Sequence, residues 1–299
     1  MDRLEVFTEA VDSVLAQTYR PLEVVIVIDG NPPLYDRMVT KYGEDAPVRV
    51  ELNVENRGIS YSRNRGAEVA TGEVVAFIDD DAVAEQEWIA EHVKVYKQTN
   101  AVATAGPVVP AWADGEPGFF PAEFYWLVGC TEPAFAEDGD EVRNGYGSNV
   151  SYRREVFLAL GGYDVNTGRR GDLHIQAHEA PLGVRLKSKY GSSVTYTTKP
   201  KVHHVLFNYR AKFSWLLYRS FYQGYSKRIM KLLYPDASAK ELSFLSQLIK
   251  CSVPSRIKDV AGQQSLSPIG ELVALLAFTA AVGLGYLWGV VDVSKADLV

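Results

Sequence analysis

Cysteine is scarce in this chain, which has only Cys130 and Cys251 in 299 residues. Two cysteines cannot build a disulfide framework, and they fit a protein of a reducing compartment. The sequence also lacks Cys-x-x-Cys and His-Glu-x-x-His patterns, so a structural zinc site has no support. With 47% hydrophobic and 23% charged residues, the composition is that of an ordinary globular protein.

The first 20 residues lack the basic start and the apolar run of a signal peptide. No internal repeat or low-complexity tract stands out. One long uncharged run is present, from Leu272 to Val291, and it is long enough for a helix that crosses a bilayer. The alternative is a buried core helix of a soluble protein. Trp288 and Tyr286 lie near one end of the run, as interfacial aromatic residues do.

Charge is unevenly distributed around a net value of −6, because residues 201–260 hold eleven Lys and Arg against three Asp and Glu. Within this basic segment, Phe213 to Lys231 has an apolar face and a basic face, which is typical of helices on membrane surfaces. A helix packed on its own domain is the alternative. Since the basic excess precedes the uncharged run, the positive-inside rule predicts a cytoplasmic main domain and an external tail.

Helical and strand patterns alternate through the first eighty residues, which predicts an α/β fold with a mainly parallel sheet. Expected helices and strands are Leu4–Gln17, Leu22–Ile28, Tyr35–Tyr42, Val48–Leu52, Ser62–Ala70 and Val74–Ile78. Such sheets normally begin with a strand, whereas this chain begins with a helix. Either the chain starts late, at an internal Met, or another segment fills the position of the missing first strand.

The last of these strands ends in three carboxylates, Asp79, Asp80 and Asp81. A buried strand places such a cluster at the carboxyl edge of the sheet, where open α/β sheets bind ligands. In extended chain Asp79 and Asp81 share one side and Asp80 points to the other. Carboxylates suit Mg²⁺ or Mn²⁺ that also binds a diphosphate. A solvated acidic turn is the alternative.

Several ordered motifs over residues 8–186 resemble family 2 glycosyltransferases, which are inverting nucleotide-sugar enzymes of GT-A fold. These motifs are Ala10–Tyr19, Val24–Gly30, Asn56–Asn64, Phe77–Asp81, Gly161–Asp164 and Leu182–Leu186. The resemblance implies that Asp29 holds the base, that Asp79 and Asp80 belong to the donor site and that Asp81 binds the metal. Arg63 would neutralise phosphate or organise the acidic cluster; a buried ion pair without a catalytic role is the alternative.

The acceptor side departs from the family pattern. Counting back from Leu182 places Glu179 where the family has its catalytic Asp, and His178 where it has Glu. Glu179 would accept the proton of the acceptor hydroxyl. Asp172 is the rival base. The alternative for Glu179 is a surface acid that is favoured at the start of a helix by the helix dipole. The His203-His204 pair follows an edge strand, and one of the two, assigned as His204, would complete the metal site.

The resemblance predicts a catalytic domain over residues 1–205, with a nucleotide-sugar half of about 1–105 and an acceptor half of about 106–205. A basic membrane-surface segment (206–265), a transmembrane helix (270–292) and a tail (293–299) would follow.

The resemblance implies an enzyme that transfers a sugar from a UDP-sugar to a dolichyl- or polyprenyl-phosphate-linked glycan, with Mg²⁺ or Mn²⁺. Its likeness is to archaeal enzymes of N-glycosylation, among them transferases of hexuronic acids. Membrane lipids are expected partners and nucleic acid is not. The alternatives are a polyprenyl-phosphate sugar synthase, a cell-surface polysaccharide transferase, or a non-catalytic, degenerate transferase.

Overall fold

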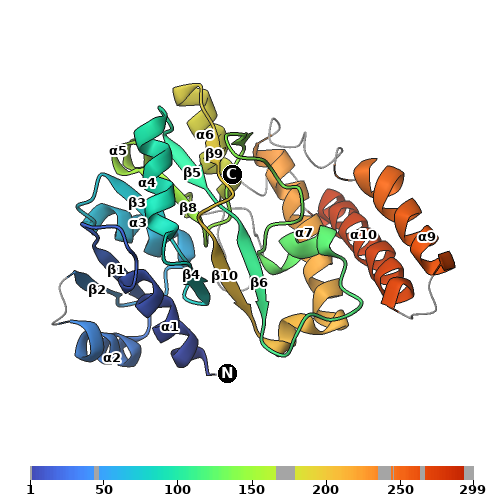
Figure 1. Cartoon of the computed structure of the whole chain (residues 1–299), viewed down its shortest axis with the longest axis horizontal. Helices are drawn as coiled ribbons and strands as arrows, with labels where there is room; N and C mark the ends of the chain where they lie inside the picture. The colour runs from blue at the N-terminus through green and yellow to red at the C-terminus, as the bar shows by residue number, and fades with distance from the viewer. Residues whose placement is uncertain are drawn as a thin grey trace. The chain divides into compact units, whose positions relative to one another are not determined.

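The computed structural model describes residues 2–43, 47–165, 179–234, 244, 246–262 and 267–292 (Figure 1). The chain divides into two compact units. The first comprises Met1–Val109 and Ala134–Val205, and the second comprises Pro110–Pro133 and Leu206–Val299.

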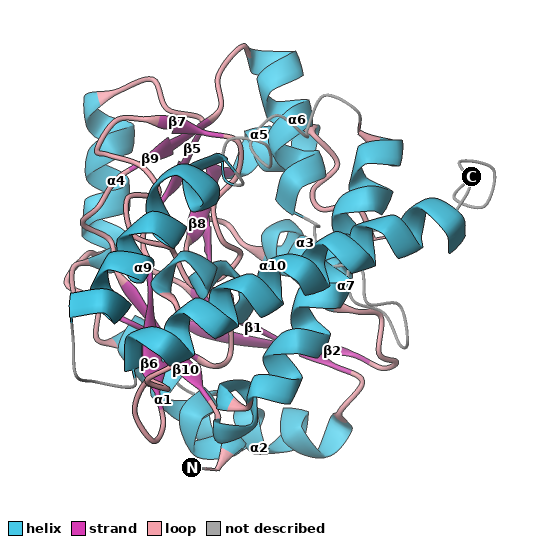
Figure 2. Ribbon diagram, turned by 90° about the vertical axis from the view of Figure 1, so that its right-hand side faces the viewer, coloured by secondary structure: helices cyan, strands magenta, loops and turns pink. Residues whose placement is uncertain are grey.

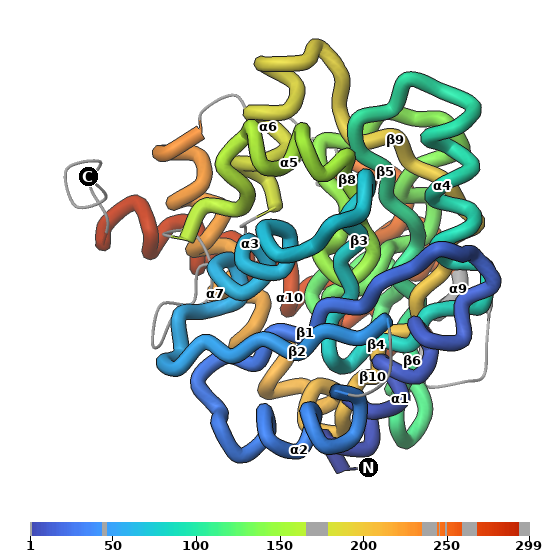
Figure 3. The backbone as a smooth tube through the Cα atoms, turned by 90° about the vertical axis from the view of Figure 1, so that its left-hand side faces the viewer, coloured from blue at the N-terminus to red at the C-terminus, as the bar shows by residue number. Residues whose placement is uncertain are grey.

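The amino-terminal part of the first unit alternates helices and strands, as the sequence predicts. Its elements are α1 (Arg3–Leu15), β1 (Val24–Asp29), α2 (Pro32–Tyr42), β2 (Val48–Asn53) and α3 (Ile59–Val69). Strands β1 and β2 pair in parallel, from Val24 opposite Val48 to Asp29 opposite Asn53 (Figure 3). Because parallel strands end at the same edge, Asp29 and the loop after Asn53 are brought together.

The first unit also contains a five-stranded sheet, in the order β3-β8-β5-β9-β7. The strands are β3 (Val74–Phe77), β8 (Val150–Arg153), β5 (Ala103–Ala105), β9 (Val194–Tyr196) and β7 (Glu141–Val142). Pairing is mixed: β5 and β9 are parallel, whereas β8 lies antiparallel between β3 and β5. The α/β class is therefore as predicted, with parallel pairing in β1–β2 and mixed pairing in this sheet.

Helices α4 (Trp88–Gln98), α5 (Arg154–Ala159) and α6 (Glu179–Tyr190) complete this unit. A further strand, β10 (Val202–Leu206), pairs antiparallel with β4 (Ala82–Ala84) and has β6 (Val108–Trp112) as its other neighbour. This pairing places His204 opposite Ala82, immediately after the acidic cluster.

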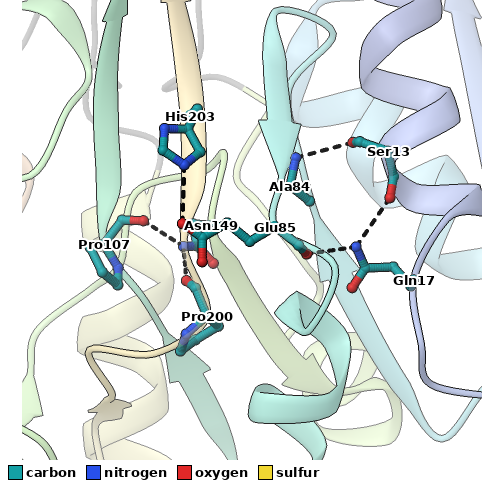
Figure 4. Close-up of polar contacts among 8 residues, drawn as sticks. All are labelled: Ser13, Gln17, Ala84, Glu85, Pro107, Asn149, Pro200 and His203. Carbon is teal, nitrogen blue, oxygen red and sulfur yellow. Dashed lines mark hydrogen bonds and ion pairs between the residues drawn. The ribbon is translucent and has the colours of Figure 1, made fainter.

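Helix α1 is fastened to β4 by two polar side chains (Figure 4). The Ser13 hydroxyl accepts a hydrogen bond from the Ala84 amide at 3.0 Å, and the Gln17 amide nitrogen donates to the Glu85 carbonyl at 2.8 Å. The 3% exposed Gln17 side chain also accepts from the Ile89 amide at 2.9 Å. These bonds satisfy backbone groups next to the acidic turn and fix its approach to α1.

Asn149, directly before β8, is the centre of a buried polar network, and Figure 4 shows its contacts with Pro107 and Pro200. Its nitrogen donates to the carbonyls of Pro107 and Pro200, at 2.8 and 2.6 Å. Its oxygen accepts from Trp88 Nε1 at 2.8 Å and lies 3.0 Å from His92 Nε2. Burial lowers the pKa of His92 to about 4, so the ring is neutral and Nε2 is the donor.

The second unit is mainly helical (Figure 2). Its elements are η1 (Ala122–Val128), η2 (Asn208–Ala211), α7 (Phe213–Leu233), η4 (Leu248–Ser252), α9 (Val253–Gly262) and α10 (Ser267–Asp292). Phe278 of α10 is fully buried against Phe120, Phe124 and Phe213, with ring centroids 5.4–6.1 Å apart. Of the aromatic residues at Pro110–Trp126, Phe120 and Phe124 thus form core.

Candidate active site

The acidic cluster lies on a turn that follows β3. The strand ends at Phe77, and the Ala82 amide donates to the Asp79 carbonyl at 3.2 Å, so the chain reverses within the cluster. As a result Asp79 and Asp81 have different partners. Asp79 contacts α3 through Arg63, whereas Asp81 lies beside β10 through His204.

Arg63 joins the acidic turn to the start of α6. Its Nη2 lies 2.5 Å from Asp79 Oδ1, and its Nη1 lies 4.0 Å from Glu179 Oε1. The side chain is only 9% exposed. Burial alone would lower the pKa of Arg63, but the charges of Asp79 and Glu179 outweigh it and raise that pKa, so the guanidinium stays charged.

Gly147 gives the Arg63 guanidinium the room that it occupies. A Cβ atom on Gly147 would lie 2.3 Å from Arg63 Nη1 and 2.7 Å from Cζ. The Gly147 amide also donates to Glu179 Oε1 at 3.2 Å. One glycine therefore borders the cation and orients the carboxylate beside it.

Glu179 is the first residue of α6, and its side chain is 19% exposed. The contacts with Gly147 and Arg63 bring it to the same cation that holds Asp79. A solvated helix-start acid would be more open, so this environment favours a role in the site. His178 and the rival base Asp172 lie outside the described residues.

Asp81 and His204 form the second pair of the site. His204 Nε2 lies 3.1 Å from Asp81 Oδ1, with side-chain exposures of 8% and 17%. His203 points elsewhere, because its Nε2 lies 3.1 Å from Glu85 Oε1 (Figure 4). Within the described residues no three His, Cys, Asp or Glu side chains converge. One carboxylate and one imidazole remain a sufficient protein contribution for an ion that also binds phosphate.

Asp80 as a whole residue is exposed, but neighbouring protein atoms shield its carboxyl group from part of the solvent. This burial and the charges of Asp81 and Asp79 raise the pKa of Asp80 to about 6. Solvent screens part of the effect. Three carboxylates on one turn therefore create a negative potential that a cation would relieve.

Asp29 organises the loop between β2 and α3. Its Oδ1 accepts from Asn53 Nδ2 at 2.9 Å and from the Arg57 amide at 3.0 Å, while Oδ2 accepts from the Gly58 amide at 2.8 Å. A carboxylate oxygen has two lone-pair positions, so Oδ2 can accept one more donor. Asp29 thus can hold both the loop and a base imide.

The motif Gly161–Asp164 is held by α3 and α6. Asn64 donates to the Tyr163 carbonyl and accepts from the Tyr163 amide, both at 2.8 Å. Gly162 has a φ of 65°, and a Cβ there would lie 2.3 Å from Asn64 Oδ1. Arg185, within Leu182–Leu186, donates to the Gly162 carbonyl at 2.6 Å. These motif residues therefore build the frame around Arg63.

Two residues of this region were not predicted from the sequence, Gly147 and Asn149. The segment Gly145–Arg153 has a strand pattern, although β8 begins only at Val150. A glycine inside such a pattern indicates close approach of other groups, which was the available signal for Gly147. Nothing in the sequence indicates the partners of Asn149, because they lie on three separate segments of the chain.

Comparison with known proteins gives consistent results. The family described as "Glycosyl transferase family 2" matches residues 2–161. The glucosyl-dolichyl phosphate glucuronosyltransferase of Haloferax volcanii is 53% identical over 290 residues, covering 97% of this chain and 93% of that protein.

Among solved structures, a mannosyltransferase from Pyrobaculum calidifontis in complex with GDP-Man and Mn²⁺ has a TM-score of 0.55 and 18% identity, covering 95% of this chain and 84% of that one. The structure of GalNAc-T7 with UDP, GalNAc and Mn²⁺ has a TM-score of 0.51 and 16% identity. It covers 77% of this chain, which spans about half (48%) of that protein. These likenesses show a shared GT-A fold, and the chain belongs to glycosyl transferase family 2.

Proposed function

We propose that this protein transfers a hexuronic acid from a nucleotide sugar to a dolichyl-phosphate-linked saccharide, with inversion at the anomeric carbon. Likeness to the Haloferax volcanii protein, over nearly the whole of both chains, supports the substrate class. The observation that carries the proposal is Arg63, which contacts Asp79 of the donor side and approaches Glu179 of the acceptor side. One buried cation thus couples the two halves of a transferase site.

The donor half would use Asp29 and Asp79. Asp29 would accept the imide hydrogen of a uracil through Oδ2, which favours a UDP-sugar. Asp79, held by Arg63, would accept a ribose hydroxyl. Asp80 lies on the same turn and adds negative charge there.

Asp81 and His204 are the residues that would hold a divalent cation, and their chemistry fits one. A carboxylate suits Mg²⁺ and Mn²⁺, and the added imidazole favours Mn²⁺ of the two. When bound, the ion would stabilise the negative charge of the departing diphosphate.

Glu179 would act as the general base. As the acceptor oxygen bonds to the anomeric carbon, the bond from that carbon to the diphosphate breaks and the hydroxyl proton passes to the Glu179 carboxylate. The Gly147 amide holds one oxygen of this carboxylate, which limits its rotation. A single displacement of this kind converts an α-linked donor into a β-linked product.

A membrane is the proposed location. Helix Pro268–Asp292, with a mean hydropathy of 1.9, is long and apolar enough to cross one by length and composition. The charge distribution predicts that the catalytic unit faces the cytoplasm. Length alone predicts a single crossing, with residues 293–299 on the far side, whereas the close packing of this helix on α7 favours attachment to one surface.

The test is a panel of nucleotide sugars incubated with the purified protein and either glucosyl-dolichyl phosphate or dolichyl phosphate. We expect mass addition of one hexuronic acid to the glycosylated lipid, with UDP-glucuronic acid as donor. Transfer to bare dolichyl phosphate would instead identify a polyprenyl-phosphate sugar synthase. Binding of donors without transfer to any acceptor would favour a degenerate transferase.

A further inference from the structure

Helix α10 has one face packed against protein along its length. Leu275, Phe278, Gly285 and Gly289 are buried, and the spacing of three, four and seven places them on one face. At its beginning, Glu271 Oε2 lies 3.2 Å from Arg256 Nη2 of α9. In Figure 1, α10 lies between α7 and α9. A lone transmembrane helix would instead be surrounded by lipid.

The opposite face of α10 is an uninterrupted exposed apolar stripe. It contains Ile269, Val273, Leu276, Ala280, Leu284, Leu287 and Val291, which recur every three or four residues. Leu284 is 61% exposed and Leu287 is 62% exposed. The stripe contains no charged residue, and Trp288, 56% exposed, borders it. An apolar surface of this length indicates contact with a membrane or another protein.

The packing of α7 on α10 is close and parallel. A Cβ on Gly285 would lie 1.8 Å from the Phe221 carbonyl oxygen, and one on Gly289 would lie 3.0 Å from Arg228 Cγ. Phe213, at the start of α7, contacts Phe278 of α10 with ring centroids 5.4 Å apart. Contacts therefore advance in the same direction along both helices, and neither helix can enter a bilayer without the other.

Helix α7 is chemically unsuited to the bilayer interior. It carries Arg219, Lys227, Arg228 and Lys231 and no acidic residue. Cations at the centre of a membrane are costly and rare. They are favourable near anionic headgroups instead.

The direction of the two helices gives a second argument against a crossing. If parallel α7 and α10 both crossed, the chain between them would have to cross back. The described part of that connection includes Lys250, Arg256 and Lys258. Arg256 also pairs with Glu123, at 2.7 Å, so this connection carries ion pairs that a lipid environment would disfavour.

We propose that α10 does not cross the membrane but lies in its surface, with the exposed apolar stripe in the lipid and the cations of the second unit at anionic headgroups. Exposed Lys212, Lys231, Lys250 and Lys258 would supply these contacts. The mode of attachment is independent of the sugar transferred. It places the protein on one leaflet only, the leaflet that holds its lipid-linked acceptor.

The test of the stripe uses the full chain and vesicles of phosphatidylcholine with 0 or about 30% phosphatidylglycerol. We expect Leu284→Glu to lower the affinity for anionic vesicles, measured by co-sedimentation, by roughly tenfold or more, because it places a charge in the lipid. Val54→Glu, at a 78% exposed position of the first unit, is the matched control and should bind normally. Equal thermal unfolding of both variants establishes that α10 remains folded.

Topology gives the decisive measurement. In a Cys251→Ser background, Lys258→Cys and Asp292→Cys are made separately and expressed in cells, and sealed membrane vesicles of known sidedness are treated with an impermeant maleimide. Labelling of both cysteines from the same side supports surface attachment. Labelling from opposite sides would overturn the proposal in favour of a crossing. Conversion of a dimer to a monomer by Leu284→Glu, with vesicle binding unchanged, would also overturn it.

Discussion

Replacing Gly147 by alanine tests whether the position of Arg63 controls catalysis. The new Cβ would lie 2.3 Å from Arg63 Nη1, whereas ordinary contacts begin near 3.4 Å. The guanidinium must therefore move by roughly 1 Å, away from Asp79 or from Glu179. Misplacement of this size in an active site costs about 10²-fold in rate, or about 2.7 kcal/mol in the activation free energy. We expect kcat/KM to fall by about that factor.

The assay measures the initial rate of sugar transfer to the lipid-linked acceptor at 25 °C, and thermal unfolding is measured in parallel. Gly66→Ala is the matched control. A Cβ at Gly66 would lie 3.5 Å from Val27 Cγ2, an ordinary contact, and Gly66 lies in the interior of α3. Alanine there should leave kcat/KM unchanged and stabilise the helix by about 0.5–1 kcal/mol.

A double-mutant cycle with Arg63→Lys decides whether the effect acts through Arg63. The lysine ammonium is narrower than a guanidinium, so the alanine should cost much less in that background. A coupling free energy above about 0.5 kcal/mol is expected for residues in contact. Additive losses, or normal kcat/KM in Gly147→Ala, would refute the steric argument.

Three further outcomes are expected. Asp81→Ala should abolish transfer without unfolding the protein, and EDTA treatment of the wild type should do the same reversibly; normal turnover of Asp81→Ala in EDTA would contradict the metal assignment. Glu179→Gln should lower kcat by about 10²–10⁴ with donor affinity retained, and Glu179→Asp should be less impaired because it keeps the charge; full loss in Asp172→Asn with normal Glu179→Gln would transfer the role to Asp172. The pKa of His92 is lowered to about 4 in the folded protein, so between pH 6.5 and 4 the unfolded chain binds a proton that the folded chain does not. The free energy of unfolding should therefore fall as the pH falls through that window, by up to roughly 3 kcal/mol. His92→Gln should lose this part of the pH dependence when unfolding is measured by chemical denaturation.

Local sequence patterns predicted the elements that carry the site. The apolar run before Asp79 is β3, and the helical pattern before Gly72 is α3, because periodicity and turn residues act within a few positions. The parallel pair β1–β2 was predictable as well, since a helix connects two buried strands. Glu179 was chosen as the candidate base by counting back from Leu182, the first residue of the Leu182–Leu186 motif.

Contacts between distant segments were predictable only in part. The family resemblance placed Asp81 and His204 in one metal site, and the two side chains do meet. Nothing in the sequence indicates that Arg63 approaches Glu179, because this contact depends on how α3 and α6 are placed. The antiparallel insertion of β8 between β3 and β5 has no local signal either. The extended-chain argument treated Asp79 and Asp81 as one pair, whereas the turn gives each its own partner.

Hydropathy describes composition, and for this reason the sequence predicts a transmembrane helix over residues 270–292 but not what packs against it. A membrane-crossing helix and a helix packed along one face have the same count of apolar residues. They differ in what covers Phe278 and Gly285, which are buried, and Leu284, which is exposed. Because parallel α7 brings its cations along the same helix, the physical question becomes the position of those charges. Charges that stay at the headgroups require α10 to remain there with them.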